Sequence, residues 1–176
     1  EGRNVIVDYK IDGGFLKKRA NTFRAVDNVS ISLHEGQTIG VVGESGSGKS
    51  TLGRALLRLI SSKGAYRFGK TDISGLDRTG MRPLRRSMQV VFQDPYGSLS
   101  PRQTVGEIIT EGLYVHEPQL SRADRDQRAI AALKEVGLDP AARNRYPHEF
   151  SGGQRQRIAI ARAMILKPQA VILDEP

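Results

Sequence analysis

The stretch GESGSGKST, residues 43–51, constrains the fold of this 176-residue chain more than any other feature. It matches the pattern G-x-x-x-x-G-K-[ST] through Gly43, Gly48, Lys49 and Ser50. Glycines let the backbone curl so that several N–H groups face one anion, and a following helix adds the partial positive charge of its first turn. The pattern therefore predicts a phosphate-binding loop between a strand and a helix, rather than a simple Gly/Ser turn that joins them.

The segments on both sides of this loop agree with that arrangement. The apolar run TIGVVG, residues 38–43, predicts a short strand buried on both faces, as in a parallel sheet. After the loop, apolar residues at helical spacing predict an amphipathic helix; they are Leu52, Ala55, Leu56, Leu59 and Ile60. In such a loop Lys49 reaches the β- and γ-phosphates, and the hydroxyl of Ser50 ligates Mg²⁺. The other residues of the loop, also expected to bind the nucleotide, are Gly43, Glu44, Ser45, Gly46, Ser47, Gly48 and Thr51.

The rest of the chain mixes strand-like and helix-like patterns. Ser121 with Asp124 forms a variant of the capping box at the start of one predicted helix, and Gly137 is a stop signal at its end. The predicted strands are residues 4–11, 25–36, 65–73 (a hairpin around Gly69), 88–93 and 170–174; helices are predicted within 104–137 and 151–166, and residues 13–24 read as a basic turn or loop.

This order of elements predicts the fold class. Strands that alternate with helices indicate an α/β core around a parallel sheet. The half-buried alternation in residues 25–36 adds an antiparallel β subdomain near the N-terminus. We expect residues 1–95 to form the nucleotide-binding core with this β subdomain, residues 96–150 an inserted α-helical subdomain, and residues 151–176 a return to the core.

Composition excludes some kinds of site. The chain has no cysteine, which rules out disulfide bonds and thiolate metal sites. No apolar run is as long as a membrane span requires. The formal net charge of +8 fits either a nucleic-acid or acidic-membrane partner or a solvated basic surface. Aromatic residues make up only 6% of the chain, which argues against a module that stacks nucleic-acid bases.

Two carboxylates follow the last predicted strand. In VILDEP, residues 171–176, Asp174 ends the apolar run and Glu175 comes next. A phosphate loop needs a metal partner and a group that positions water. Asp174 is therefore the candidate metal ligand, through water, and Glu175 the candidate general base. Without the phosphate loop, the same pair would read as a solvated strand end.

A third motif, FSGGQ at residues 150–154, opens a helical pattern. Ser151 is a helix N-cap, and Gly152 and Gly153 leave backbone N–H groups exposed. This helix start is a second candidate anion site. A plain capped helix explains the serine and one glycine, but not Ser-Gly-Gly-Gln, ending at Gln154, in the same chain as a strand that ends in Asp-Glu.

With these motifs together, the chain resembles the nucleotide-binding domain of an ATP-binding cassette (ABC) transporter. GESGSGKST resembles the Walker A loop, FSGGQ the signature motif, and VILDEP the Walker B strand with its catalytic glutamate. Gln93 in VVFQDP resembles the Q-loop glutamine, a catalytic residue that ligates Mg²⁺ and senses the transmembrane partner. Tyr9 is similar in placement to the aromatic residue that stacks on adenine, and Phe15 and Phe23 are rivals for that role.

The resemblance implies a RecA-like phosphate-loop NTPase core and two ligands, ATP and Mg²⁺. The implied ligands of Mg²⁺ are Ser50, Gln93 and Asp174. In this family two domains pair head to tail, so that the signature residues of one chain contact ATP bound mainly by the other. In this chain those residues are Ser151, Gly152, Gly153 and Gln154.

The family pattern continues beyond Walker B with a D-loop and a switch histidine. The three histidines of this chain are His34, His116 and His148, and all of them precede Asp174. We therefore expect the sequence to be a fragment, truncated after Walker B, that does not turn over ATP by itself. Whether the whole chain holds one cassette or two stays open, as does whether the fragment folds alone.

Within the family, RYPHEFSGGQRQRIAIARA looks most like the ATPase subunits of oligopeptide and dipeptide importers. The implied partners are a second nucleotide-binding domain, transmembrane permease subunits and, indirectly, a periplasmic or extracellular solute-binding protein, at the cytoplasmic face of a bacterial membrane and without nucleic acid. The solute could be a dipeptide, an oligopeptide, nickel or a peptide antibiotic. The alternative is a non-transport ABC ATPase that acts on DNA or ribosomes, although only residues 94–149 separate Gln93 from the signature.

Overall fold

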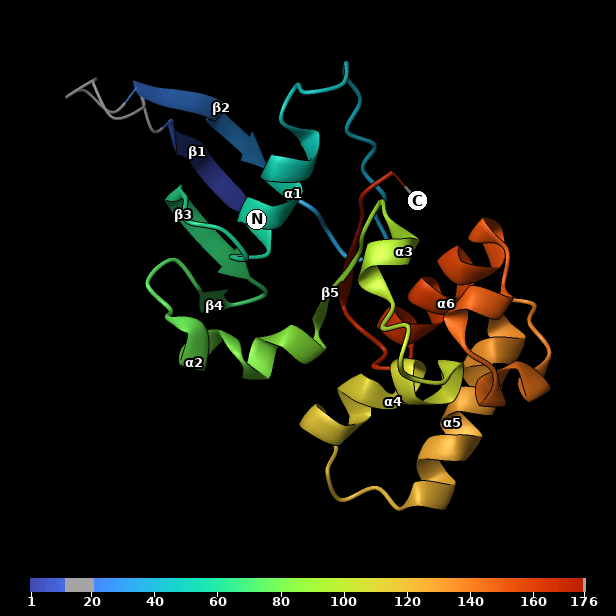
Figure 1. The fold of residues 1–176 in the computed structure, drawn as a ribbon. Helices are drawn as coiled ribbons and strands as arrows, with labels where there is room; N and C mark the ends of the chain where they lie inside the picture. Colours follow the sequence, from blue (N-terminus) through green and yellow to red (C-terminus); the bar gives the residue numbers. More distant parts are fainter. Residues whose placement is uncertain (12–20, 176) are drawn as a thin grey trace. The chain divides into compact units, whose positions relative to one another are not determined.

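A computed structural model of the chain describes residues 1–11 and 21–175; residues 12–20 and Pro176 lie outside the description. The chain divides into two compact units, Glu1–Met81 and Arg82–Pro176. An antiparallel sheet is the main element of the first unit, whereas helices make up most of the second (Figure 1). No helix within the described ranges combines the length and the apolar character of a membrane span.

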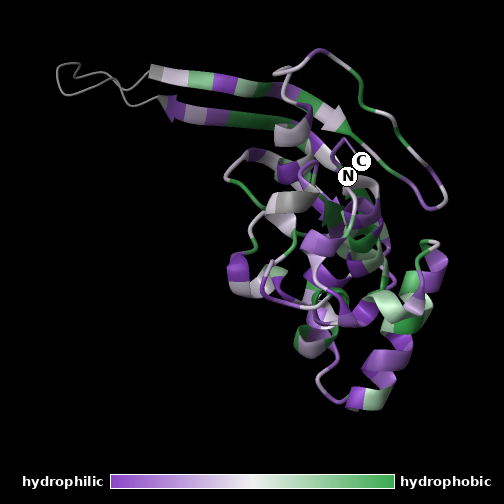
Figure 2. Ribbon diagram, turned by 45° about the vertical axis from the view of Figure 1, so that its right-hand side comes forward, coloured by the Kyte–Doolittle hydropathy of each residue, from purple (hydrophilic) through white to green (hydrophobic). Residues whose placement is uncertain are grey.

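The first unit is built on a four-stranded antiparallel sheet with the strand order β2-β1-β3-β4. Figure 2 shows hydrophilic and hydrophobic residues alternating in bands along β1 and β2, and Val5, Val7 and Val26 are buried. The predicted antiparallel strands are confirmed, as is the hairpin at Gly69, which has φ 57°. The elements of this unit are β1 (Gly2–Ile11), β2 (Asn21–Ile31), α1 (Lys49–Leu56), β3 (Lys63–Phe68), β4 (Thr71–Asp72) and α2 (Arg78–Met81).

Three boundaries in this unit differ from the sequence prediction. The strand predicted over residues 25–36 ends at Ile31, and Leu33 is 44% exposed. Residues 21–24, expected in a loop, begin β2, because each of them pairs with a residue of β1. The helix after the phosphate loop is shorter than its apolar stripe: α1 ends at Leu56, and Leu59 is 43% exposed. Arg58 has φ 54°, in the left-handed region, so the backbone leaves the helical path there.

The prediction of a buried parallel strand at residues 38–43 is wrong for this structure. The segment carries no strand pairing, and the side chain of Val42 is 92% exposed. The parallel strands that the structure describes are β5 (Met88–Val91) and β6 (Ala170–Leu173), which pair with each other. An apolar run is a local signal, whereas the hydrogen bonds that make a strand come from distant segments. The run alone therefore did not suffice to predict a paired strand here.

The second unit joins that parallel pair to a set of helices. Met88 lies opposite Ala170 and Val91 opposite Leu173, which confirms both predicted strands and their predicted parallel arrangement. Residues 96–150 are largely helical, as predicted. The helical elements are η1 (Pro83–Arg86), α3 (Pro95–Ser98), α4 (Val105–His116), α5 (Arg122–Glu135), η2 (Pro140–Asn144), η3 (Pro147–Glu149) and α6 (Gly152–Met164).

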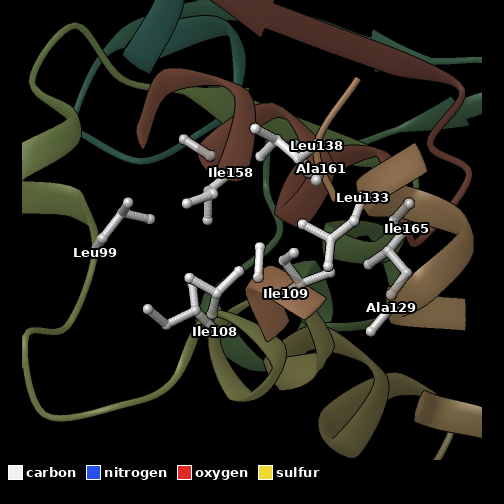
Figure 3. Packing of buried hydrophobic residues seen from close by; sticks show 14 of the residues in the cluster. Leu99, Ile108, Ile109, Ala129, Leu133, Leu138, Ile158, Ala161 and Ile165 are labelled. Atoms are coloured by element: carbon white, nitrogen blue, oxygen red, sulfur yellow. The ribbon is translucent and has the colours of Figure 1, made fainter. Parts of the chain in front are cut away.

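The core of this unit lies where α4, α5 and α6 meet. Ile109, Leu133 and Ile158, one from each helix, are fully buried, and Figure 3 shows their side chains converging. Removing an aliphatic side chain of this size from water is worth about 1.5–3 kcal/mol. The core therefore fixes the course of α6, whose first turn carries the Ser-Gly-Gly-Gln motif.

Candidate functional site

The phosphate loop, residues 43–51, takes its shape from its glycines. Gly46 and Gly48 have φ values of 80° and 92°, in the left-handed region. At Gly48 a Cβ atom would lie 2.3 Å from the carbonyl oxygen of Ala25, so only glycine fits. The backbone N–H of Ser47 donates to the carbonyl oxygen of Glu44 at 3.2 Å and closes the curl. Turns of this kind form concave backbone surfaces that bind anions.

Lys49 adds a full positive charge to this curl. Its Nζ donates to the carbonyl oxygens of Gly43 and Glu44 at 2.9 and 2.8 Å. Lys49 is also the first residue of α1, which has no side-chain cap and no acidic residue in its first turn. The partial positive charge of this helix start is therefore not neutralised locally. An ammonium group, an uncapped helix and a glycine curl together fit a phosphate group.

Two candidates for adenine stacking lie side by side in the same unit. Tyr9 of β1 pairs with Phe23 of β2, and their side chains are 41% and 52% exposed. Both rings are thus accessible to a ligand, and both remain candidates. Phe15, the third candidate, lies outside the described residues.

In the second unit, the structure brings Gln93 and Glu175 together. Gln93 Nε2 donates to Glu175 Oε2 at 2.5 Å, although the residues are 82 positions apart. The backbone N–H of Asp174 donates to the carbonyl oxygen of Val91 at 2.9 Å, which fixes Asp174 at the end of β6. Parallel strands end at one edge of a sheet, so residues that follow β5 and β6 meet there.

Each residue predicted to ligate Mg²⁺ offers a group of the kind that suits a hard divalent cation. The hydroxyl of Ser50, the amide oxygen of Gln93 and the carboxylate of Asp174 are all oxygen donors, the kind that Mg²⁺ prefers. Ser50 belongs to the first unit, and the other two residues belong to the second. Among residues 1–11 and 21–175, no group of three or more His, Cys, Asp or Glu side chains gathers in a way that could hold a metal ion.

The signature segment forms an ordered helix start. Gln154 N donates to Ser151 Oγ at 3.4 Å, and Ser151 N donates to Gln154 Oε1 at 3.0 Å, which makes a complete capping box. Gly152 and Gly153 are exposed, and a Cβ on either would meet nothing within 4 Å. The first turn of α6 contains no acidic residue. Its positive end is thus fixed in place and open to solvent.

Sequence reasoning missed Arg155, which ties α6 to the turn before it. Arg155 Nε donates to the carbonyl oxygen of Pro147 at 2.8 Å, and Nη2 donates to that of His148 at 3.3 Å. A signal was present: Arg155 stands four residues after Ser151, and a helical side chain leans back over the preceding turn. His148 itself is exposed, and its ring stacks on Tyr146 at a centroid distance of 5.8 Å.

Sequence reasoning also missed Arg145, which holds the same turn from the other side. Arg145 Nη2 donates to the carbonyl oxygen of Glu149 at 3.0 Å, and Nε pairs with Glu149 Oε1 at 3.2 Å. The guanidinium carbon lies 4.5 Å from the ring centroid of Phe150, which is buried. The pKa of Glu149 is lowered, first because the backbone N–H of Tyr146 donates to its carboxylate.

Comparison with known sequences decides the family. Residues 26–176 match the family described as ABC transporter. The chain belongs to this family. It is 61% identical over 176 residues to the peptidoglycan transport ATP-binding protein YejF of Agrobacterium fabrum, covering 100% of this chain and 32% of that protein. The chain thus spans about a third of the length of this ABC transporter relative.

Other ABC proteins agree in sequence and in fold. The oligopeptide transport ATP-binding protein OppF of Salmonella typhimurium is 51% identical over 156 residues, which is 88% of this chain and 47% of OppF. The dimeric structure of a post-hydrolysis state of the ATP-binding cassette MJ0796, bound to ADP and Pi, is 29% identical. It superimposes with a TM-score of 0.85 and covers 98% of this chain and 72% of that one. The predicted family and fold class are therefore confirmed.

Proposed function

We propose that the protein containing this chain binds and hydrolyses ATP as the nucleotide-binding subunit of a transporter. The observation that carries the proposal is the hydrogen bond between Gln93 and Glu175, beside Asp174 at the end of β6. It sets a candidate base and two oxygen donors at one edge of a parallel sheet, in a chain that also has a phosphate loop around Lys49. This combination fits phosphoryl transfer to water.

Nucleotide binding falls to the first unit. The backbone of residues 43–51 cradles the phosphates, and the ammonium of Lys49, now held by two loop carbonyl oxygens, pairs with the β- and γ-phosphates. Tyr9 or Phe23 stacks on the adenine, since both rings are exposed on neighbouring strands. The hydroxyl of Ser50 supplies a ligand for the metal ion that accompanies ATP.

Hydrolysis falls to the residues that follow β5 and β6. A bound Mg²⁺, held by Ser50, Gln93 and Asp174, would neutralise charge that develops on the phosphate oxygens. Glu175 accepts a proton from water while the water oxygen bonds to the γ-phosphorus and the bond to the bridging oxygen breaks, leaving ADP and phosphate. Gln93 orients the carboxylate of Glu175 through its amide N–H.

The signature segment acts on a second nucleotide-binding domain. Ser151, Gly152, Gly153 and Gln154 contact the phosphates of ATP held mainly by that partner. The support is that the first turn of α6 is capped, exposed and free of acidic side chains. The domain that supplies the ATP is a second copy or a related cassette, and the related cassette MJ0796 forms a dimer.

The transported solute is proposed to be an oligopeptide or a dipeptide. The support is the similarity to an oligopeptide transport ATP-binding protein and to a peptidoglycan transport ATP-binding protein. The solutes in both names contain peptide. On this proposal the cassette sits at the cytoplasmic face of a bacterial membrane, bound to permease subunits, and a solute-binding protein delivers the peptide from outside. Closure and opening of the paired cassettes moves the permease between its access states.

The test uses the full-length protein reconstituted with its membrane partners. Steady-state ATPase activity is compared between wild type and Glu175→Gln, with and without candidate peptides. We expect Glu175→Gln to bind ATP normally and to lose turnover by about 10²–10⁴-fold, since it removes a general base. Glu135→Gln, at an exposed position on α5, is the matched control and should keep full activity.

Two results would contradict the proposal. Full turnover of Glu175→Gln would remove the base from the mechanism. Activity that ignores the membrane partners but rises with DNA or ribosomes would move the chain to a non-transport role within the family.

A further inference from the structure

The turn that leads into the signature helix has little stability of its own. Turn η3 (Pro147–Glu149) is a single 3₁₀ turn, closed by the backbone bonds Glu149 N to Tyr146 O at 3.0 Å and Phe150 N to Pro147 O at 3.2 Å. Such turns have poor hydrogen-bond geometry and occur in short pieces. Yet the path of this turn decides where the chain enters α6, and so where Ser151 stands.

Two guanidinium groups bind three successive carbonyl oxygens of this segment. Arg155 takes those of Pro147 and His148, at 2.8 and 3.3 Å, and Arg145 takes that of Glu149, at 3.0 Å. Arg155 reaches backward from α6, whereas Arg145 reaches forward from the end of η2. The turn is therefore held from both sides by residues outside the Ser-Gly-Gly-Gln motif.

The chemistry of these contacts requires arginine. A guanidinium is a planar fork of several donors, so Arg155 can serve two neighbouring carbonyl oxygens at once. Arg145 also pairs with the carboxylate of Glu149 and lies over the ring of Phe150. A lysine at either position keeps the charge but lacks the fork and the flat face.

The start of α5 offers a matched reference within the same unit. Arg125 stands four residues after the N-cap Ser121, as Arg155 does after Ser151. It donates to the carbonyl oxygen of Pro118 at 3.2 Å, and its guanidinium carbon lies 4.1 Å from the ring centroid of Tyr114. The same structural device thus occurs at a helix start to which we assign no ligand.

We propose that Arg145 and Arg155 are positioning residues for the nucleotide contact of α6. They hold η3 and Phe150 in one conformation, so that Ser151 and the first N–H groups of the helix face the nucleotide of the second cassette already ordered. Neither arginine touches the nucleotide. Without them the segment samples other paths into α6. Ordering the segment then costs conformational entropy when two cassettes associate, which weakens the association. The inference rests on the function proposed above for residues 151–154.

The test follows ATP-dependent association of the full-length protein in the Glu175→Gln background, which keeps ATP bound. Arg145→Ala, Arg155→Ala, Arg145→Lys and Arg155→Lys are compared with the parent and with the control Arg125→Ala. Sedimentation in Mg-ATP gives the dissociation constant of the dimer, a fluorescent ATP analogue gives the affinity of the monomer for nucleotide, and a thermal melt gives stability.

We expect each alanine variant to raise the dimer dissociation constant by about tenfold, the effect of losing one hydrogen-bonded contact to a charged group. Monomer affinity for the analogue should stay within about twofold, because the phosphate loop is untouched. The lysine variants should be weakened as well, with melting like that of the parent. Arg125→Ala should associate like the parent.

The outcomes separate this inference from the proposed function. If the parent binds the analogue but never associates with ATP, the proposed role of the signature residues fails, and the inference fails with it. If the parent associates and the lysine and alanine variants associate equally well, only the positioning role is overturned. Should the alanine variants melt early, the lysine variants decide: weaker association with parent-like melting supports the role, and parent-like association refutes it.

Discussion

Helices α5 and α6 begin with the same kind of cap, but they differ in the charge of the residue that completes it. Each starts at a serine that forms a capping box with the third residue of the helix. In α5 that residue is Asp124, whose pKa is lowered first because Ser121 Oγ donates to its carboxylate. In α6 it is Gln154, which is neutral. The carboxylate neutralises the positive end of α5, while the end of α6 stays available to an outside anion.

Helix α4 begins like α5, with a carboxylate in its capping box. Its capping box joins Thr104 to Glu107, whose pKa is lowered first by the backbone N–H of Thr104. Helix α1, by contrast, has neither a side-chain cap nor an acidic residue in its first turn. Of the four helices with eight or more residues in the described part of the chain, α4 and α5 thus begin with a carboxylate in the first turn, and α1 and α6 do not. The two starts without a carboxylate belong to the segments that resemble the Walker A loop and the signature motif.

The largest expected effect is at α1. Lys49→Ala removes the ammonium that bridges Gly43 and Glu44 and leaves the loop without its full positive charge. ATP affinity should fall sharply, and turnover of the full-length protein should fall by about 10²–10³-fold, as for other single preorganised donors. Lys70→Ala, exposed in the turn between β3 and β4, is the control and should leave both quantities unchanged. Unaltered nucleotide affinity in Lys49→Ala would mean that this helix start does not hold phosphate.

The next largest effect is the difference in stability loss when alanine replaces glycine at the starts of α1 and α6. Gly48→Ala puts a Cβ 2.3 Å from the carbonyl oxygen of Ala25 at φ 92°, so it should lower the free energy of unfolding by about 1–3 kcal/mol or more. Gly152→Ala meets nothing within 4 Å and occupies the first position of a helix, so stability should change by less than about 0.5 kcal/mol. Denaturant titration of both variants measures this, and equal losses would refute the distinction.

The smallest effect is the dependence of stability on pH. The folded-state pKa values of Glu107 and Asp124 are lowered, so their contributions are fully present above the unfolded pKa values, about 4.3 for Glu and 3.9 for Asp. They are lost as pH falls through the lower folded values. Glu107→Gln and Asp124→Asn should therefore flatten the acid side of a plot of melting temperature against pH. Gln154→Ala should shift that plot without changing its slope, because an amide does not titrate.

Local signals foretold the helix starts well. The capping boxes at Ser121 and Ser151 consist of residues three positions apart, so they form as soon as the chain turns. Gly137 ends its helix with φ 69°, which sequence reasoning also expects. Such contacts lie within one or two turns of the chain and need no partner from elsewhere.

Non-local features were predicted less well. The strand expected at residues 38–43 needs partners that its own sequence does not supply, and the structure leaves Val42 exposed. The contact between Gln93 and Glu175 was accessible only through family resemblance, because nothing in the spacing of 82 positions indicates a hydrogen bond. The buried carboxylate of Glu117, paired with Arg86 at 3.0 Å and Arg128 at 2.9 Å, gave no sequence signal at all.

The most direct test of the account makes the start of α6 resemble that of α4. Gln154→Glu converts a neutral capping box into a carboxylate one of the same length, which favours the helix dipole and should keep or raise the melting temperature. The same charge would face the nucleotide of the second cassette, so ATP-dependent association and turnover of the full-length protein should fall by about tenfold or more. The reverse change, Asp124→Gln in α5, should lower stability slightly and leave association intact. Association of Gln154→Glu at the wild-type level would contradict the claim that the first turn of α6 binds a phosphate group.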